Sequence, residues 1–346
     1  MSRERGRRLT SRDVARQAGV SQATVSNVLN HPHLVAPATL ARVRAAMDEL
    51  GFVVDSGARR LRAGRSATLA VSVLDTGNPF WGEVVRGVTD FAATCGYVVV
   101  LGSTSESPQR EAEHLRVFRE QRAAGLLAAP VDPDLSGLAR AAAEGLPVVL
   151  LDYQDPAGRL PFVGVDDVRG AELAVDHLLE LGHRRIAFLN GPHRIGWCVD
   201  RLAGARRAAS ARGLDVVGTV LEVPVDALTA SEGDRAMSEH VLRRSDVTAV
   251  LCVNDMVALG ALRALHRGGV RVPADMSVVG YDDTAFAEML QPSLTTVRQE
   301  PYRIGREAAR LVVQAIEEPD AAPGRNRVFA PELVVRESTA PPLSRT

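Results

Sequence analysis

Polar side chains recur directly after short apolar runs along most of this 346-residue chain. Where such runs form the parallel strands of an α/β sheet, ligands bind beyond the carboxyl ends of the strands. The repetition therefore indicates a site for a small polar ligand, although a strand-end Asp or Asn can instead cap the next helix, the role expected for Asp255 or Asp283. The strand-end set is Asp75, Asn78, Asp152, Asp166, Asn254, Asp255, Asp282 and Asp283.

Sequence motifs for covalent or phosphate chemistry are missing from the chain. There is no Lys, hence no G-x-x-x-x-G-K-[ST] phosphate loop, and G-x-S-x-G, G-x-G-x-x-G and H-E-x-x-H are absent. The three cysteines lie far apart and are odd in number, which predicts reduced thiols rather than disulfides or a zinc site. We expect no enzyme, no cofactor and no metal.

The elements that would position these polar residues alternate between apolar runs and helical stretches from Thr68 onward. Continuous apolar strands separated by helices predict parallel sheets that are covered on both faces. The strands are too many for one small sheet, so two α/β lobes with a cleft between them are expected. The runs are 69–74, 98–101, 125–129, 147–152, 185–190, 248–255 and 276–283, and the helical stretches lie near 81–95, 108–122, 168–182, 199–213, 256–268 and 301–318.

The charge of the chain is divided very unevenly along its length. Residues 1–65 carry 12 Arg against five acidic residues, giving +7, and residues 66–346 carry 29 Arg against 37 acidic residues, giving −8. The net charge of −1 is thus a cancellation. A basic head on an acidic body is typical of a nucleic-acid-binding module joined to a second domain.

Residues 10–51 of this basic head have the pattern of three short helices. Thr10 with Asp13 forms a capping box, Gly19 permits the first helix to end, and Ser21 can cap the second. Pro37 fits the first turn of the third helix. Two helices around an Ala-Gly-Val-Ser turn predict a helix-turn-helix, whose second helix enters the DNA major groove.

The segment TSRDVARQAGVSQATVSNVLN, residues 10–30, resembles the DNA-binding helices of the lac repressor (LacI/GalR) family. The resemblance implies that Gln22, Ala23 and Asn27 read bases, since amides pair with adenine and Ala contacts the thymine methyl group. It places the other polar side chains of the segment at phosphates, which fix the register of the protein on DNA. These phosphate-contacting residues are Ser21, Thr24, Ser26 and Asn30.

The linker DSGARRLRAGR, residues 55–65, resembles the hinge helix of the same family. The resemblance implies that Leu61 wedges into the minor groove at the operator centre, with Arg59 and Arg62 among the flanking arginines. An apolar wedge kinks DNA at a cost of a few kcal/mol, which the contacts made by bent DNA offset. Gly57 weakens such a helix, so we expect it to order only on DNA.

The body resembles the effector domain of this family, which is similar to periplasmic sugar-binding proteins. Matching segments include NPFW at 78–81, VGVDD at 163–167, VVGYDD at 278–283 and LTTVRQ at 294–299. Carboxylates and Arg suit the vicinal hydroxyls of a sugar, and Trp197 stands where relatives have a small residue. The resemblance places effector contacts at Phe80, Trp81, Asp152, Trp197, Arg201, Asn254, Asp282 and Gln299.

The sequence thus predicts a cytoplasmic, homodimeric, ligand-responsive transcription regulator, most simply a repressor, that binds a pseudo-palindromic operator duplex and has no membrane segment. The rival interpretations are a solute-binding protein and a cytoplasmic sugar-binding or sugar-metabolising α/β protein without a DNA role. The expected parts are an all-α helix-turn-helix head at 1–54, a hinge at 55–66, an α/β body at 67–338 and a disordered tail at 339–346. Within the body, the first lobe spans about 67–163 and 292–324, and the second about 164–291 and 325–338.

Overall fold

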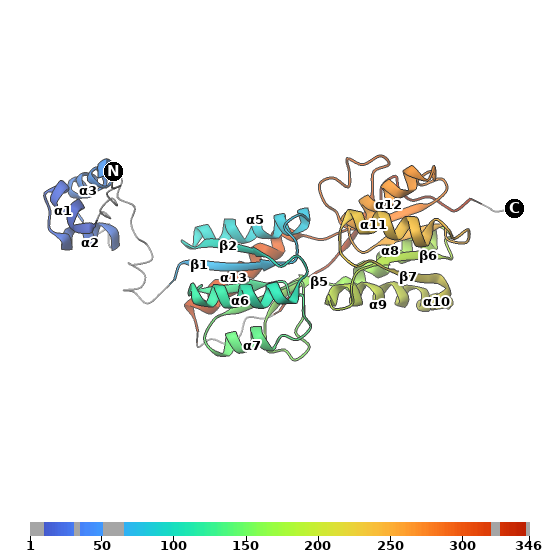
Figure 1. Ribbon diagram of the computed structural model, residues 1–346, viewed down its shortest axis with the longest axis horizontal. Coiled ribbons are helices and arrows are strands. Elements are labelled where there is room, and N and C mark those ends of the chain that lie inside the picture. The colour runs from blue at the N-terminus through green and yellow to red at the C-terminus, as the bar shows by residue number, and fades with distance from the viewer. Residues whose placement is uncertain (1–9, 31–34, 51–65, 320–325, 344–346) are drawn as a thin grey trace, which may run out of the picture. The chain divides into compact units, whose positions relative to one another are not determined.

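The computed structural model describes residues 10–30, 35–50, 66–319 and 326–343, and divides the chain into two compact units on either side of the Arg65–Ser66 bond. The first unit holds three helices (Figure 1), namely α1 (Ser11–Ala18), α2 (Gln22–Asn30) and α3 (Pro37–Leu50). Val14, Val25 and Val43, one from each helix, are fully buried in its small core. The three predicted helices are confirmed.

Local signals in the sequence set the ends of these helices. The carboxylate of Asp13 accepts hydrogen bonds from the backbone N–H and the hydroxyl of Thr10, at 2.9 and 2.7 Å. Gly19 ends α1 in the left-handed conformation (φ 64°), which a glycine adopts without steric cost. Ser21 Oγ accepts from the N–H of Thr24 at 3.0 Å, so it caps α2 as predicted.

The second unit is an α/β body with two six-stranded sheets (Figure 1). All strand pairs in the first sheet are parallel, and its strand order is β11-β5-β4-β3-β1-β2. Its strands are β1 (Thr68–Val73), β2 (Val98–Ser103), β3 (Gly125–Ala128), β4 (Val148–Leu151), β5 (Phe162–Val165) and β11 (Arg327–Phe329).

The second sheet has the order β12-β10-β9-β8-β6-β7 and is parallel except for the β10–β12 pair. Strands β6 and β8 are fully buried apolar runs, as expected for strands covered on both faces. The strands are β6 (Ile186–Asn190), β7 (Val220–Pro224), β8 (Ala249–Cys252), β9 (Ser277–Asp282), β10 (Thr295–Arg298) and β12 (Glu332–Val334).

Helices cover both faces of each sheet, which defines two lobes and confirms the predicted fold class. On the first sheet, α5 (Pro79–Thr94) and α13 (Pro301–Glu317) cover one face, and α6 (Pro108–Glu120) and α7 (Ser136–Ala143) the other. On the second sheet, α8 (Asp167–Glu180) and α9 (Gly196–Ala211) lie opposite α11 (Ala230–Ala236) and α12 (Asp255–Arg267). The remaining short elements are α10 (Val216–Thr219) and the π-helical turn Met237–Val241.

The chain passes between the lobes three times, after β5, after β10 and after β11. The crossings differ from the lobe boundaries expected from sequence. Residues 295–298 pair in the second sheet rather than the first, and residues 327–329 pair in the first sheet rather than the second. Strands of only three or four residues leave no periodicity to read, because their position depends on partners that are distant in sequence.

The C-terminal segment follows the second lobe beyond the last strand. The backbone N–H of Ala340 donates to Ser277 Oγ, and its carbonyl lies 3.0 Å from His183 Nε2. Residues 339–343, expected to belong to a disordered tail, therefore contact the lobe. Among the residues that the structure describes, no helix is both long and apolar enough to cross a membrane.

Candidate nucleic-acid interface and ligand cavity

Helix α2 has one face in the core of the head and one face in solvent. Val25 and Val28 are buried against the other two helices. Gln22, Ala23 and Asn27, the predicted base-reading residues, are all exposed. Gln22 Nε2 donates to Ser11 Oγ at 3.0 Å, which steadies this amide at the start of the helix. The exposed face thus offers two amides and a methyl group, the groups that suit A·T base edges.

The predicted phosphate-contacting residues lie around the same helix. Ser21 and Ser26 are exposed and Thr24 is half-buried, and the hydroxyls of Ser21 and Thr24 share a hydrogen bond of 2.9 Å. Asn30 is the last residue of α2. The hinge residues Arg59, Leu61 and Arg62 lie outside the described residues.

A cavity of about 560 Å³ lies between the two lobes of the body. Its wall on the first lobe includes Asp152 and Tyr153, which follow β4, and its wall on the second lobe includes Trp197 and Asp200 of α9. Asp166 and Asp167, at the passage from β5 to α8, join the two walls. The volume lies within the range of small-molecule sites in proteins.

Two of the eight predicted effector residues, Asp152 and Trp197, line this cavity. Phe80 and Trp81 are buried in the apolar core and pack edge to face, with ring centroids 5.1 Å apart. Asn254 caps α12 by accepting from the N–H of Val257 at 2.8 Å. The expectation that Asp255 or Asp283 caps the helix that follows it is wrong, because Asp255 accepts from Thr284 and Thr296 and Asp283 pairs with two arginines.

Arg201, Asp282 and Gln299 lie together in the buried floor behind the cavity. Arg201 Nε donates to Asp167 at 2.7 Å, and its Nη1 donates to the carbonyl of Val253 at 2.5 Å and lies 4.0 Å from Asp282. Gln299 Nε2 donates to Asp282 at 2.8 Å. Asp167 is not among the effector residues predicted from sequence, although it follows the strand end beside Asp166.

Two aromatic rings enclose the guanidinium of Arg201. Its central carbon lies 4.3 Å from the ring centroid of Trp197 and 3.5 Å from that of Tyr281. Only 2% of Arg201 is exposed. Such stacking is favourable for a desolvated cation. Because Trp197 also lines the cavity, its ring separates Arg201 from the cavity.

Three buried carboxyl groups surround the single cation Arg201, and the pKa values of all four groups are shifted. Burial, followed by the charge of Asp167, raises the pKa of Asp152 to about 7. Burial raises the pKa of Asp167 and of Asp282 against the lowering effect of Arg201. Burial lowers the pKa of Arg201, but Asp167, Tyr281 and Asp282 reverse this, so the net shift is upward. Arg201 therefore stays charged among three buried carboxyl groups.

Two of these carboxyl groups sit on unusual backbone. Asp152 has φ 53° and Asp282 has φ 114°, and such positive values are uncommon in residues other than glycine. Such residues cost about 1–3 kcal/mol each and cluster at functional sites, where the surrounding structure enforces them. Asp152 follows β4 on the cavity wall, and Asp282 ends β9 in the buried floor behind it.

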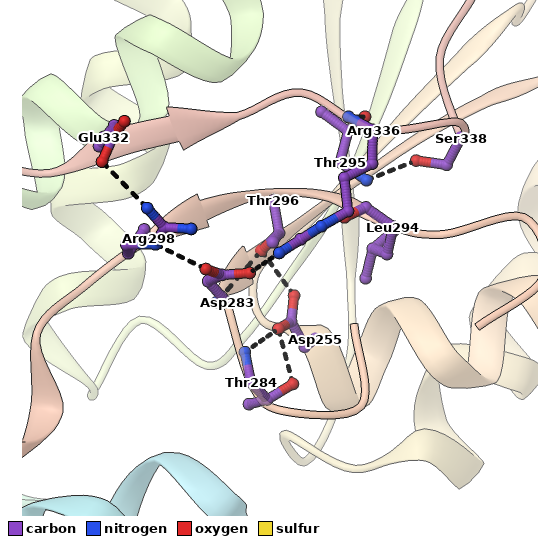
Figure 2. A network of polar contacts seen from close by, with 10 residues as sticks. All are labelled: Asp255, Asp283, Thr284, Leu294, Thr295, Thr296, Arg298, Glu332, Arg336 and Ser338. Atoms are coloured by element: carbon purple, nitrogen blue, oxygen red, sulfur yellow. Dashed lines mark hydrogen bonds and ion pairs between the residues drawn. The ribbon is translucent and has the colours of Figure 1, made fainter. Parts of the chain in front are cut away.

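A network of ion pairs and hydrogen bonds holds the strands beside Asp282 (Figure 2). Asp255 accepts from the N–H and hydroxyl of Thr284, both at 2.8 Å, and from the hydroxyl of Thr296 at 2.7 Å. Asp283 bridges Arg298 and Arg336, each at 2.7 Å. The network ties β9 to β10 and to the segment after β12, and so fixes the backbone next to Asp282.

A loop of the first lobe that contains none of the predicted site residues contacts the second lobe directly. Glu106 of the first lobe accepts from the N–H of Leu228 at 3.0 Å and lies 3.6 Å from Arg194 of the second. Burial raises the pKa of Glu106. A Cβ on Gly196 would lie 2.6 Å from the ring of Tyr153, so this glycine permits a second close contact between the lobes.

Comparison with known proteins agrees with this arrangement of head and body. Residues 10–55 match the family model of bacterial regulatory proteins of the lacI family, and residues 175–339 match a periplasmic binding protein-like domain. The chain is 32% identical over 334 residues to the transcriptional repressor PurR of Photobacterium profundum, covering 95% of this chain and 98% of that protein.

Two solved structures of transcription regulators are also similar to nearly the whole chain. A lac repressor dimer bound to operator and the anti-inducer ONPF is 31% identical, with a TM-score of 0.84 over 96% of this chain and all of that chain. The regulator CelR in complex with cellobiose is 34% identical, with a TM-score of 0.71 over 96% of this chain and all of that chain.

A helix-turn-helix head on a two-lobed body with a ligand cavity defines a ligand-responsive, DNA-binding transcription regulator. The repressors it resembles along nearly its whole length belong to a class of regulators rather than enzymes. The chain belongs to the lacI family of bacterial transcription regulators.

Proposed function

We propose that this regulator is a cytoplasmic repressor that binds a pseudo-palindromic operator as a homodimer, under the control of a small polar effector between the lobes. The exposed face of α2 supplies Gln22, Ala23 and Asn27 to the major groove, and Leu61 with Arg59 and Arg62 supplies the minor-groove contacts. The lac repressor, bound to operator as a dimer, is the model for this arrangement.

One observation carries the effector site: a buried acceptor on the cavity wall lacks a partner. Asp152 is 6% exposed, and its Oδ1 has no hydrogen-bond partner among the described residues. A buried carboxylate oxygen left unpaired is costly, and a ligand hydroxyl or amine would satisfy it. Gln299 Oε1, in the floor beneath, is a second buried acceptor without a partner in the described chain.

The predicted effector residues form two groups in this proposal, one that contacts the ligand and one that lies behind the first. Asp152 and Trp197 contact the ligand directly, whereas Arg201, Asp282 and Gln299 form the buried floor behind them and Asn254 caps α12. A ligand that reaches Arg201 must first displace the ring of Trp197. Phe80 and Trp81 support the wall from the core of the first lobe.

The apolar edge of the first sheet is the proposed dimer contact. Strand β2 ends the sheet, and its Val98, Val100 and Leu101 are 65%, 37% and 42% exposed. An edge strand with exposed apolar side chains offers both backbone groups and area to a second copy. The effector, through its differential affinity for two arrangements of the lobes, would change the spacing of two DNA-binding heads joined by this contact.

The experiment is a selection of duplexes from a random pool, followed by binding measurements on the selected site. We expect an inverted repeat, bound with a steep dependence on salt because phosphate contacts release counterions. A compound that raises the melting temperature of the protein should also shift its affinity for that duplex. Failure to enrich any duplex would contradict the DNA role, and enrichment of a single half-site would contradict the dimer.

We expect Asn27→Ala to relax base preference. A bidentate amide contact to adenine contributes about 1–3 kcal/mol of discrimination, and the side chain of Asn27 is exposed and outside the core of the head. Because the dimer loses this contact in both half-sites, affinity for the selected duplex should fall by about 30-fold or more, whereas affinity for random duplex should stay the same. Equal losses on both duplexes would make Asn27 a phosphate contact.

A further inference from the structure

Among the residues that the structure describes, the wall of the cavity is acidic and offers no available cation. Four aspartates line it, Asp152, Asp166, Asp167 and Asp200, whereas the lining cations are Arg194 and, when protonated, His193. Both lie against carboxylates of their own: Arg194 is 3.6 Å from Glu106, and His193 is 2.6 Å from Glu222. Neither is therefore free to balance the aspartates.

Three of the four aspartates have no cationic partner among the described residues. Asp167 is paired with Arg201 at 2.7 Å. Asp166 accepts only from the backbone N–H of Arg169, at 2.9 Å, and Asp200 of α9 makes no ion pair within the described chain. Asp152 accepts a backbone hydrogen bond from Val165, and its Oδ1 has no partner there.

Neighbouring aspartates raise the pKa of two carboxyl groups of the cavity wall, those of Asp152 and Asp200. The charges of Asp167 and Asp200 contribute to raising the pKa of Asp152, and those of Asp167 and Asp166 contribute to raising the pKa of Asp200, in both cases after burial; Arg201 lowers both pKa values without reversing the net rise. A positive charge in the cavity would relieve this repulsion and stabilise all three unpaired carboxylates at once.

Arg201 does not provide that charge to a ligand. Its guanidinium is 2% exposed, is held by Asp167 and the carbonyl of Val253, and lies behind the ring of Trp197. What a ligand meets instead is carboxylate together with Trp197 and Tyr153, which both line the cavity. Aromatic rings beside carboxylates are the surroundings that proteins use to bind organic ammonium groups.

We infer that the effector of this regulator is a small organic cation, an amine-bearing polyol such as an aminosugar, whose ammonium group lies against Asp152 and between Asp166 and Asp200. The inference rests on the proposed effector site and specifies its chemistry. Hydroxyl groups of the same ligand would reach the remaining acceptors, and the neutral and anionic sugars that share its ring would bind more weakly because they leave the carboxylates unbalanced.

The test compares matched compounds on the full-length protein by isothermal titration calorimetry and thermal shift. The amines are glucosamine, galactosamine and mannosamine, and each is paired with its parent sugar, its N-acetyl derivative and its 6-phosphate. We expect at least one amine to bind at least tenfold more tightly than its neutral and anionic partners, and its affinity to fall as salt is raised.

Two variants test which aspartates bind the ammonium group of the ligand. Asn tolerates the positive φ of Asp152 about as well as Asp does, so Asp152→Asn should fold, and it should weaken binding of the amine at least tenfold. Asp200→Asn, at an exposed position, should weaken it several-fold. The matched control is Asp226→Asn, whose side chain is 86% exposed and pairs with Arg235 outside the cavity, and it should leave the affinity unchanged.

The outcomes separate this inference from the proposed function. A neutral or phosphorylated sugar that binds as tightly as its amine overturns the cationic effector, yet leaves the effector site standing. Amine binding that both variants leave unchanged overturns the assignment to these aspartates. If no compound of the panel binds, the aminosugar effector is overturned, whereas the small polar effector of the proposed function is judged by the melting-temperature and duplex-affinity measurements and operator binding by duplex selection.

Discussion

Arg201→Met is expected to lower the free energy of unfolding of the body by about 3–5 kcal/mol, the cost of breaking a buried ion pair by removing one partner. Arg201 is the cation at the centre of Asp152, Asp167 and Asp282, and its contacts with Asp167 and the carbonyl of Val253 are fully buried. Met fills much of the volume, so the loss reports the charge and hydrogen bonds. Urea denaturation followed by circular dichroism measures it.

The loss should also depend on pH. Without Arg201 the pKa values of the three buried carboxyl groups rise further above their unfolded values. A carboxyl group with a raised folded-state pKa favours the folded state below its unfolded pKa, and this contribution is lost as pH rises through the folded pKa. The deficit of the variant relative to the wild type should therefore be larger at pH 8 than at pH 6. A deficit that is constant across this range would contradict the electrostatic explanation.

Helix α9 supplies the matched control for this substitution. Arg206→Met changes the same residue type one and a half turns later, where the side chain is 42% exposed and pairs with Glu222 at 3.3 Å. Exposed ion pairs contribute about 0–1 kcal/mol, so the control should lose no more than that. Arg201→Met should in addition abolish the response to effector, which Arg206→Met should retain.

The double substitution Val98→Asp with Val100→Asp is expected to produce a monomer with at least about 100-fold lower operator affinity. Both residues project from the same face of the edge strand β2, because side chains alternate along a strand. Negative charges there would oppose each other across a two-fold contact. Linked heads gain about 10²- to 10⁴-fold over one head from effective concentration alone, and a monomer loses that gain.

Sedimentation and fluorescence anisotropy measure this second effect. Val217→Asp is the control, because Val217 is also an exposed valine, at 70%, but lies in α10 of the other lobe, away from β2. It should leave both mass and affinity unchanged. A double variant that stays dimeric with full operator affinity would place the dimer contact elsewhere on the body.

The elements that could be predicted from sequence are those whose signals are local. Thr10, Gly19, Ser21 and Pro37 mark helix ends by their own chemistry, and the head forms there as expected. Long apolar runs such as Ile186–Asn190 are strands because they are buried on both faces. Short edge strands such as Arg327–Phe329 cannot be recognised in the sequence. Their residues are largely exposed, and they form a strand only because a strand that is distant in sequence lies beside them.

The candidate site also contains some residues whose place could be predicted from sequence and others whose orientation could not. Asp152 and Asp282 stand at strand ends, so the rule for parallel sheets places them near the cleft, and Arg201 reaches Asp282 at 4.0 Å. What the sequence could not reveal is which groups face outward. Trp197 shields Arg201 from the cavity, and Asp200 on the next turn of that helix faces it, because the packing of α9 against its neighbours orients both.

The three passages of the chain between the lobes bear on how the protein is made. Each sheet receives its final edge strand from the last part of the chain, β11 for the first and β12 for the second. During synthesis the head, which is local in sequence, can fold while the ribosome is still translating the body. Both lobes must wait for the final residues. A premature stop before Arg327 would therefore leave two incomplete sheets attached to an intact DNA-reading head.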